Sequence, residues 1–288
     1  MNTNRYFSFS RLGLVMKRDL MENWKTNLYV FLGIFFAFLL VYLTIMNNHD
    51  HAVYEMQKQV GSYINSYTAS FVGITSFLLI YFASEMMKIM RTKEQRLSYL
   101  ILPASSLEKF VSRGLYVTIG LFVMILLASL LAELVHYVFI PFFNELPDTY
   151  KVCIWPKAWA NVFSGINLLD EGVFWEMIMG GSVALWWHSL YILGGNCFGK
   201  YAFFKTIGIM VLVAILLAWG ISCIDIQIDL ETFEWLDEFM INNENWITEN
   251  LVGGIISFMF LGFTAFNWWL SYKLFTRQQV IKPKFRLL

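Results

Sequence analysis

Six long apolar segments alternate with shorter polar segments along the 288 residues of the chain. Each is close to the roughly 20 residues that a helix needs to cross the hydrocarbon core of a bilayer. Strands of a membrane β-barrel would appear instead as segments of about ten residues with alternating hydrophobicity, and the sequence has no such series. The pattern predicts an all-α polytopic membrane protein with six transmembrane helices, at about 28–46, 67–87, 114–140, 175–195, 206–223 and 251–272.

Composition supports the same class of protein. Apolar residues make up 58% of the chain and charged residues only 15%, with a mean hydropathy of +0.55. Soluble domains carry about 25% charged residues. The chain therefore has too few charges to cover a soluble surface, and we expect an integral, multi-pass membrane protein.

The first 27 residues are basic and also carry aromatic side chains such as Phe9 and Trp24. A helix of this kind lies in the plane of the lipid headgroups instead of crossing the bilayer. The same positive charges also fix orientation, and the two roles are compatible. The first apolar run, from Leu28, lacks a small-residue cleavage site. We therefore expect a cytoplasmic interfacial helix at 1–27, followed by a retained first span.

The lysines and arginines are distributed very unevenly between the two sides of the predicted helices. Of the 21 in the chain, only Lys58, Lys151 and Lys157 fall on one side of a six-span layout. Positive charge accumulates on the cytoplasmic side of membrane proteins. Both termini are therefore expected in the cytoplasm, with residues 273–288 as a basic tail.

Residues 88–113 form the polar segment richest in both charge and turn residues. Leu97–Leu102 make a short apolar patch, and Pro103 then breaks the chain. Ser105 precedes Glu108 by three residues, which is the spacing of a capping box at the start of a helix. The segment therefore predicts a short amphipathic helix, a proline turn and a new helix that runs into the third span.

This order of residues resembles the loop between the second and third membrane helices of ABC-2 type transporter permeases. In that family, an arginine and an acidic residue precede a leucine run. A proline with small hydroxyl residues follows, and then an acidic and a basic residue enter the third helix. The resemblance implies that residues 88–113 are a cytoplasmic coupling loop that docks on the ATPase subunit. The ATPase-coupling residues would be Arg91, Glu94, Arg96, Leu100, Pro103, Ser105, Glu108, Lys109 and Arg113.

A second polar segment, residues 225–250, carries many acidic residues and no lysine or arginine. Leu230, Phe233, Leu236 and Met240 have the spacing of an amphipathic helix at the outer membrane surface. The segment resembles the pair of short outer helices between the fifth and sixth spans of ABC-2 permeases. An acidic solvated loop is the alternative.

Three ionisable residues fall within the predicted spans. Glu133 and His136 are three residues apart and therefore share one face of the third helix, and His188 lies in the fourth helix. Such groups are costly in a bilayer, which makes them candidates for a transport path. Packing and interfacial hydrogen bonding are the alternative role.

No cofactor or metal site is expected from the remaining candidates. His49-Asp50-His51 has donor groups for a metal but no further ligands nearby, so a solvated loop is favoured. Cys153 and Cys223 both fall on the outer side, where they either form a disulfide or remain isolated thiols.

The sequence contains none of the motifs of common enzymes. It has no G-x-x-x-x-G-K-[ST] phosphate loop, no H-E-x-x-H and no G-x-S-x-G, and we expect no catalytic residues. Its basic clusters line the inner membrane surface, where anionic lipids are the expected partners and nucleic acid is not.

The resemblance therefore implies a permease subunit of an ABC-2 type exporter in the bacterial cytoplasmic (inner) membrane. Its partners would be a separately encoded ATPase and a second permease, identical or different, and its cargo an amphiphilic or lipid-linked molecule. A membrane scaffold or sensor that holds a cytosolic partner is one alternative. An ion-coupled carrier that uses Glu133, His136 and His188 is another. Carriers of that kind usually contain a repeated half, and residues 28–140 and 175–272 show no convincing repeat.

Overall fold

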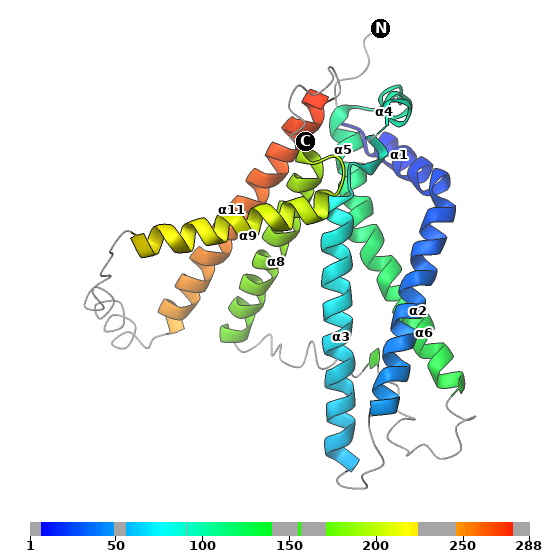
Figure 1. Cartoon of the computed structure of the whole chain (residues 1–288), viewed down its shortest axis with the longest axis vertical. Coiled ribbons are helices and arrows are strands. Elements are labelled where there is room, and N and C mark those ends of the chain that lie inside the picture. The colour runs from blue at the N-terminus through cyan, green and yellow to red at the C-terminus, as the bar shows by residue number, and fades with distance from the viewer. Residues whose placement is uncertain are drawn as a thin grey trace. The chain divides into compact units, whose positions relative to one another are not determined.

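The computed structural model describes residues 7–48, 56–90, 92–139, 155–156, 171–223 and 246–278, and the elements within them are helical (Figure 1). Five helices in this part of the chain are long and apolar enough to cross a membrane. They are Trp24–Thr44, Ile64–Met90, Ser106–Val138, Ala202–Gly220 and Gly253–Arg277. The prediction of an all-helical, multi-pass membrane protein is confirmed at this level.

The chain divides into two compact units. Unit 1 comprises Met1–Phe82 and Leu102–Gly165, and unit 2 comprises Ala83–Ile101 and Ile166–Leu288. The elements of unit 1 are α1 (Phe9–Glu22), α2 (Trp24–Asn48), most of α3 (Met56–Ser84), α5 (Ser106–Leu115), the π-helical segment η2 (Tyr116–Gly120) and α6 (Leu121–Phe139). Those of unit 2 are the end of α3, the 3-10 turn η1 (Lys88–Met90), α4 (Lys93–Leu100), α8 (Glu171–Cys197), α9 (Ala202–Cys223) and α11 (Trp246–Gln278).

A single residue, Asn23, separates α1 from α2, and the two helices meet at an angle (Figure 1). The side-chain amide of Asn23 donates a hydrogen bond to the backbone carbonyl of Asp19 at 2.9 Å. The same carbonyl also accepts the Asn23 backbone N–H at 3.2 Å, so Asn23 closes the end of α1 through both groups. The break allows α1 to lie on a surface while α2 enters the membrane.

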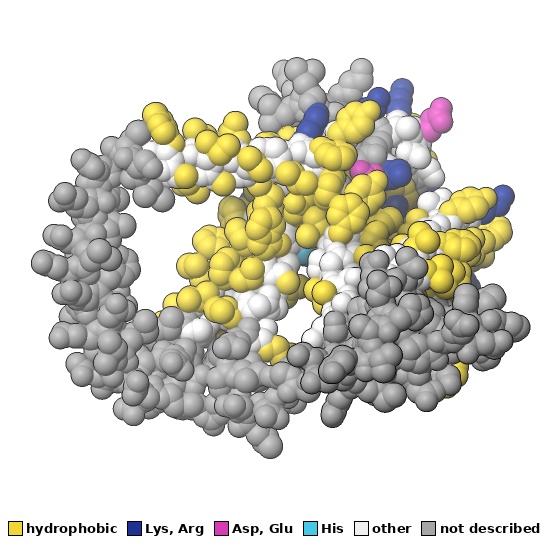
Figure 2. Space-filling model, turned by 60° about the horizontal axis from the view of Figure 1, so that its bottom comes forward, with side chains coloured by type: hydrophobic (Ala, Val, Ile, Leu, Met, Phe, Trp, Pro, Cys, Tyr) yellow, Lys and Arg dark blue, Asp and Glu magenta, His cyan; other side chains and the backbone are white. Residues whose placement is uncertain are grey.

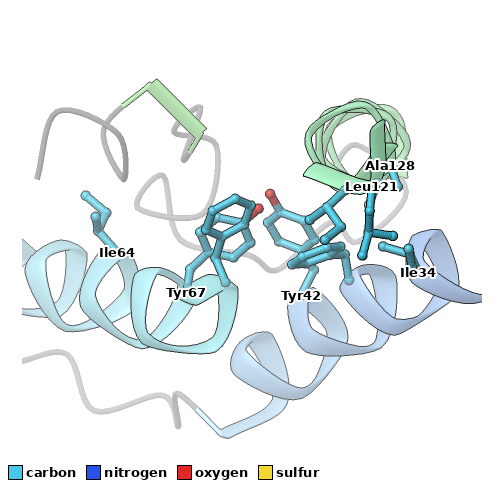
Figure 3. Close-up of a cluster of buried hydrophobic side chains, with 10 residues drawn as sticks. Ile34, Tyr42, Ile64, Tyr67, Leu121 and Ala128 are labelled. Atoms are coloured by element: carbon cyan, nitrogen blue, oxygen red, sulfur yellow. The ribbon is translucent and has the colours of Figure 1, made fainter. Parts of the chain in front are cut away.

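The core of unit 1 is formed by α2, α3 and α6. Its buried residues follow helical spacing on each helix: Ile34, Phe38 and Tyr42; Ile64, Tyr67 and Phe71; and Leu121, Ile125, Ala128 and Ala132. The Tyr42 and Tyr67 rings face one another across α2 and α3 and stack at 4.8 Å between centroids (Figure 3). The small Ala128 and Ala132 let α6 approach its neighbours closely.

Helices α5 and α6 are joined through η2 without a loop. The hydroxyl of Thr118 donates to the carbonyl of Gly114 at 2.7 Å, a side-chain bond that competes with regular helical bonding. Single π-helical turns of this kind occur often at functional sites. Helix α5 is therefore continuous with α6 through η2.

In unit 2, α8 and α11 run parallel and side by side (Figure 1). Asn267 on α11 donates to the Ser189 hydroxyl on α8 at 2.9 Å, and both residues are buried. The Trp186 ring packs against Phe260 at 5.1 Å. Polar side chains between helices are a common means of association in membranes.

Gly195 lets α8 approach the end of α3. A Cβ atom added at this glycine would lie 2.5 Å from the carbonyl oxygen of Ser84. Real Cβ atoms do not approach a backbone so closely, so only glycine fits at this crossing.

Hydrophobic side chains cover much of the described surface in Figure 2. Helix α9 is the extreme case, because its exposed residues point in all directions, among them Ile209, Leu212, Ile215, Leu216 and Trp219. A helix that is apolar all round is suited to a lipid environment and not to water. The surface therefore agrees with the length and composition of the five candidate spans.

The fourth predicted span, 175–195, lies within α8, a continuous helix of 27 residues. It is not among the five helices of the described chain that are long and apolar enough to cross a membrane. The predicted outer helices between Asp225 and Asn250 fall mainly on residues 224–245, which lie outside the described residues. Cys153, the tripeptide at 49–51 and residues 279–288 also lie outside them.

Candidate functional site

The segment between the second and third predicted spans folds into two helices separated by a turn. Helix α4 begins at a capped position, since the Thr92 hydroxyl accepts a hydrogen bond from the Gln95 backbone N–H at 3.2 Å. The Arg96 guanidinium reaches back to the Met90 carbonyl at 3.2 Å and holds α4 against η1. The chain then turns at residues 101–104 before α5 starts. The predicted helix, proline turn and second helix are confirmed.

A complete capping box starts α5. The Ser105 hydroxyl accepts from the Glu108 backbone N–H at 3.2 Å, and the Glu108 carboxylate accepts from the Ser105 backbone N–H at 2.8 Å. Two donors that the helix start would leave unsatisfied are therefore paired.

The same Glu108 carboxylate binds α1, about 100 residues away in the sequence. Its Oε1 atom accepts from the Ser8 backbone N–H at 2.7 Å and from two nitrogens of Arg11, at 2.9 and 3.2 Å. The Glu108 side chain is completely buried, whereas that of Arg11 is 27% exposed. Four N–H groups thus converge on one buried carboxylate. Charge-assisted hydrogen bonds of this kind are about twice as strong as neutral ones.

A second ion pair joins the two helices further along. Arg113 Nε lies 3.5 Å from Asp19 Oδ2, and both side chains are buried. Burial raises the pKa of the Asp19 carboxyl, while the positive charge of Arg113 acts in the opposite direction. The Arg113 guanidinium also lies 5.5 Å from the Tyr116 ring, whose hydroxyl donates to the Asn27 side chain.

These contacts together form what we call the α1–α5 junction: Ser8, Arg11, Leu12, Val15 and Asp19 on one side, and Ser105, Glu108, Phe110 and Arg113 on the other. Leu12, Val15 and Phe110 are its buried apolar residues. The residues of α1 in this junction were not among the coupling residues predicted from the sequence. Asp19 and Glu22 are the only acids in the first 48 residues, and an acid within a basic segment is the one signal that could have indicated an internal ion pair.

The predicted coupling residues therefore differ in accessibility. Glu108, Lys109 and Arg113 are buried, and Glu108 and Arg113 bind α1, so a partner protein cannot touch these two without first separating the helices. Arg96, Leu100 and Ser105 are partly exposed, and Glu94 and Pro103 are exposed. Arg91 lies outside the described residues.

Helix α4 presents an exposed apolar face. Leu97 and Ile101 are four residues apart, on one side of the helix, and are 50% and 79% exposed. Glu94 lies one turn before them and is also exposed. Exposed apolar groups bordered by charge occur where a protein contacts another protein or a membrane. We call Glu94, Leu97 and Ile101 the α4 face.

The candidates for a transport path occupy two different units. Glu133 and His136 are both 5% exposed in unit 1, and His188 is half-buried on α8 in unit 2. The His136 ring stacks on Tyr42 at 4.7 Å. Glu133 accepts from the Trp155 backbone N–H at 2.7 Å, and the Trp155 indole donates to Ser129 at 3.3 Å. Glu133 and His136 thus have packing partners.

No family model, curated protein or solved structure matches the chain. Its function must therefore be inferred from its own residues and contacts. Within the described residues, no group of three or more histidine, cysteine, aspartate or glutamate side chains could hold a metal ion.

Proposed function

We propose that the chain is the permease subunit of an ABC-2 type exporter, moved by a separately encoded ATPase. The observation that carries the proposal is the connection between α3 and α6. Its first helix exposes an apolar face, and its second helix runs through η2 into a spanning helix. The resemblance of residues 91–113 to the coupling loop of ABC-2 permeases supports the same function.

In this proposal, α8 is the fourth of six spans and both termini are cytoplasmic. The ATPase docks on the α4 face and pushes through the Pro103 turn into α5. Because α5 continues through η2, the push tilts α6 within its bundle. A second permease, identical or different, completes the path, and an amphiphilic or lipid-linked cargo leaves between the two. The bacterial inner membrane is the proposed location.

The docking role can be tested by changing Ile101 to aspartate. The exposed side chain has little to do with folding, so insertion should be unchanged, while a buried apolar contact with the ATPase is replaced by an unpaired charge. We expect co-purification of the ATPase in mild detergent to fall by about tenfold or more, as for an interface hot spot.

Tyr201→Asp provides the matched control, because Tyr201 is also an exposed large side chain, 72% accessible, in a turn predicted to be cytoplasmic. That variant should retain the ATPase. Equal recovery of the ATPase with Ile101→Asp and with the unchanged chain would contradict docking through the α4 face.

The same pulldown distinguishes the main alternative. The α4 face would also fit a non-transporting scaffold or sensor that holds another cytosolic protein. Recovery of such a partner without any ATPase would favour that function. For the ion-coupled carrier, the decisive result would be transport that needs no ATP and stops with a proton uncoupler.

A further inference from the structure

The two helices that connect α3 with α6 belong to different compact units. Unit 2 includes Ala83–Ile101, so α4 is grouped with α8, α9 and α11, whereas α5 is part of unit 1. The division falls at the turn that precedes Pro103. Helix α4 therefore has packing relations within unit 2 that do not pass through α5.

The segment from the end of α3 to α4 is packed and is not a free linker. Ser84, Met86, Met90 and Tyr99 are each at most 2% exposed. Protein interiors are close-packed, so side chains buried to this degree move together with the elements around them.

Hydrogen bonds join α4 to the end of α3 step by step. Arg96 on α4 donates to the Met90 carbonyl from Nη2 at 3.2 Å and from Nε at 3.4 Å. The backbone N–H groups of Met90, Lys88 and Met86 each donate to the carbonyl three residues earlier, at 3.0, 2.9 and 3.2 Å. The last of these carbonyls belongs to Ala83 in α3. A displacement of α4 is therefore resisted by the end of α3.

The end of α8 is held closely on two sides. A Cβ atom on Gly195 would lie 2.5 Å from the Ser84 carbonyl oxygen and 3.0 Å from its carbonyl carbon. A Cβ atom on the preceding Gly194 would overlap the Thr206 hydroxyl at the start of α9. The contact with Ser84 is made by backbone atoms, which cannot rotate aside as a side chain can. The end of α8 must therefore follow the end of α3.

We propose that α4 is coupled to α8: a partner that displaces α4 also displaces the end of α8, through η1 and the contact of Ser84 with Gly195. The source of the displacement rests on the proposed docking at the α4 face, whereas the route itself lies within unit 2. Docking would then act on α6 through α5 and on α8 through the end of α3.

The coupling can be measured in the full-length chain as non-additivity between distant substitutions. Gly195→Ala forces the ends of α3 and α8 apart, and Arg96→Gln removes the bonds that hold α4 to η1. Once η1 is loosened, the end of α3 can move aside. The fall in melting temperature caused by Gly195→Ala should therefore shrink by about half or more in the Arg96→Gln background.

Glu108→Gln is the matched control background, because it alters a contact of α5 in unit 1. Gly195→Ala should lower the melting temperature in that background as much as in the unchanged chain. An equal fall in all three backgrounds would overturn the coupling.

A load placed on α4 tests the transmission directly. In a cysteine-free background in nanodiscs, Leu97→Cys on the α4 face is biotinylated and bound to streptavidin. The Phe198 backbone N–H donates to the Gly194 carbonyl at 2.8 Å at the end of α8. Hydrogen exchange of this N–H should become faster by about threefold or more when the load is bound.

The same load on α5 is the control. Biotinylated Leu107→Cys is also an exposed position, but it lies in unit 1, so streptavidin there should leave the exchange at Phe198 unchanged. Arg96→Gln should abolish the response to the load on α4. Exchange at Phe198 that is equal with and without streptavidin on Leu97→Cys would show that α4 is not coupled to α8.

Neither measurement needs an ATPase, so the coupling and the proposed function can fail separately. Both responses in a chain that retains no ATPase would support the coupling and count against the transport function. Retention of the ATPase without either response would leave the docking in place and refute the coupling. If Gly195→Ala does not fold, the exchange at Phe198 decides alone.

Discussion

At the residue scale, Glu108 and Asp19 are two buried carboxylates with different surroundings. Glu108 accepts hydrogen bonds from Ser8, Arg11 and Ser105. The oxygens of Asp19 accept no hydrogen bond from the part of the chain that is described, and the positive charges of Arg113, at 3.5 Å, and of Arg18 offset its burial. A buried ion pair stabilises a fold only when hydrogen bonds satisfy the remaining donors and acceptors of the two side chains. The two carboxylates should therefore respond differently to loss of charge.

Replacement of Glu108 by glutamine should destabilise the protein by about 2–3 kcal/mol, because it removes a charge bonded to Arg11 and places an amide group against N–H donors. Thermal unfolding in detergent would measure the effect. Glu22→Gln, which removes an exposed ion pair with Arg18, should cost about 0.5 kcal/mol or less. Similar losses for the two variants would show that the Glu108 contacts contribute little.

Asp19 should make stability depend on pH in the direction opposite to most carboxylates. Because burial raises its pKa, the folded chain retains a proton that the unfolded chain has already released. Its favourable contribution is present below the unfolded pKa and is lost as pH rises through the folded pKa. The melting temperature of Asp19→Asn minus that of the unchanged chain should therefore increase between about pH 4 and pH 7. A flat or falling difference would contradict a raised pKa.

At the scale of elements, two kinds of helix contact recur. In the α1–α5 junction, the contact is made by charged groups at the start of α5. Glu108 completes the capping box of α5 and also binds Arg11 on α1. The α8–α11 pair instead uses small and polar residues along the length of two helices, among them Ser189 and Asn267. The difference agrees with their expected environments, because charged pairs near the headgroups are tolerated more easily than within the hydrocarbon core.

Gly195→Ala should disrupt the contact of α8 with the end of α3. The added methyl group would meet the Ser84 carbonyl oxygen at 2.5 Å, and a backbone atom cannot move aside without shifting a helix. We expect a loss of about 1–3 kcal/mol, typical of overpacking, measured by thermal unfolding.

Gly181→Ala on the same helix is the control. A Cβ atom there would meet nothing within 4 Å, so alanine should be neutral or slightly stabilising through its helix propensity. Equal losses in the two variants would mean that the effect comes from α8 itself and not from its contact with α3.

At the scale of the whole molecule, the open point of topology is the course of α8. If α8 crosses the membrane, residues 157 and 200 lie on opposite sides, because they precede and follow it. In a cysteine-free background, Lys157→Cys should react with a membrane-impermeant maleimide in intact cells, whereas Lys200→Cys should react only after permeabilisation. Equal reactivity of the two sites in intact cells would exclude a six-span arrangement with cytoplasmic ends.

Helices, caps and the turn before α5 were predictable because they depend on local rules. Apolar length predicted six spans, and five helices of the described chain are candidates for them. Ser105 with Glu108 predicted the start of α5 from spacing alone. The partners of Glu108 were not predictable, because Ser8 and Arg11 lie about 100 residues away and nothing in a single sequence pairs them. The solvent exposure of the predicted coupling residues could not be predicted from the sequence either, because burial depends on which elements pack against a helix.

The amino-acid sequence by itself determined that this chain forms apolar helices for a membrane, since the hydrophobic effect acts on each segment's own composition. It also determined a capped, proline-broken connection between two of them, because hydrogen bonds over three or four residues need no distant partner. Only the tertiary structure decided that α1 lies against α5. That choice depends on the pairing of Arg11 with Glu108 and of Asp19 with Arg113, which occurs only when helices far apart in sequence are brought together.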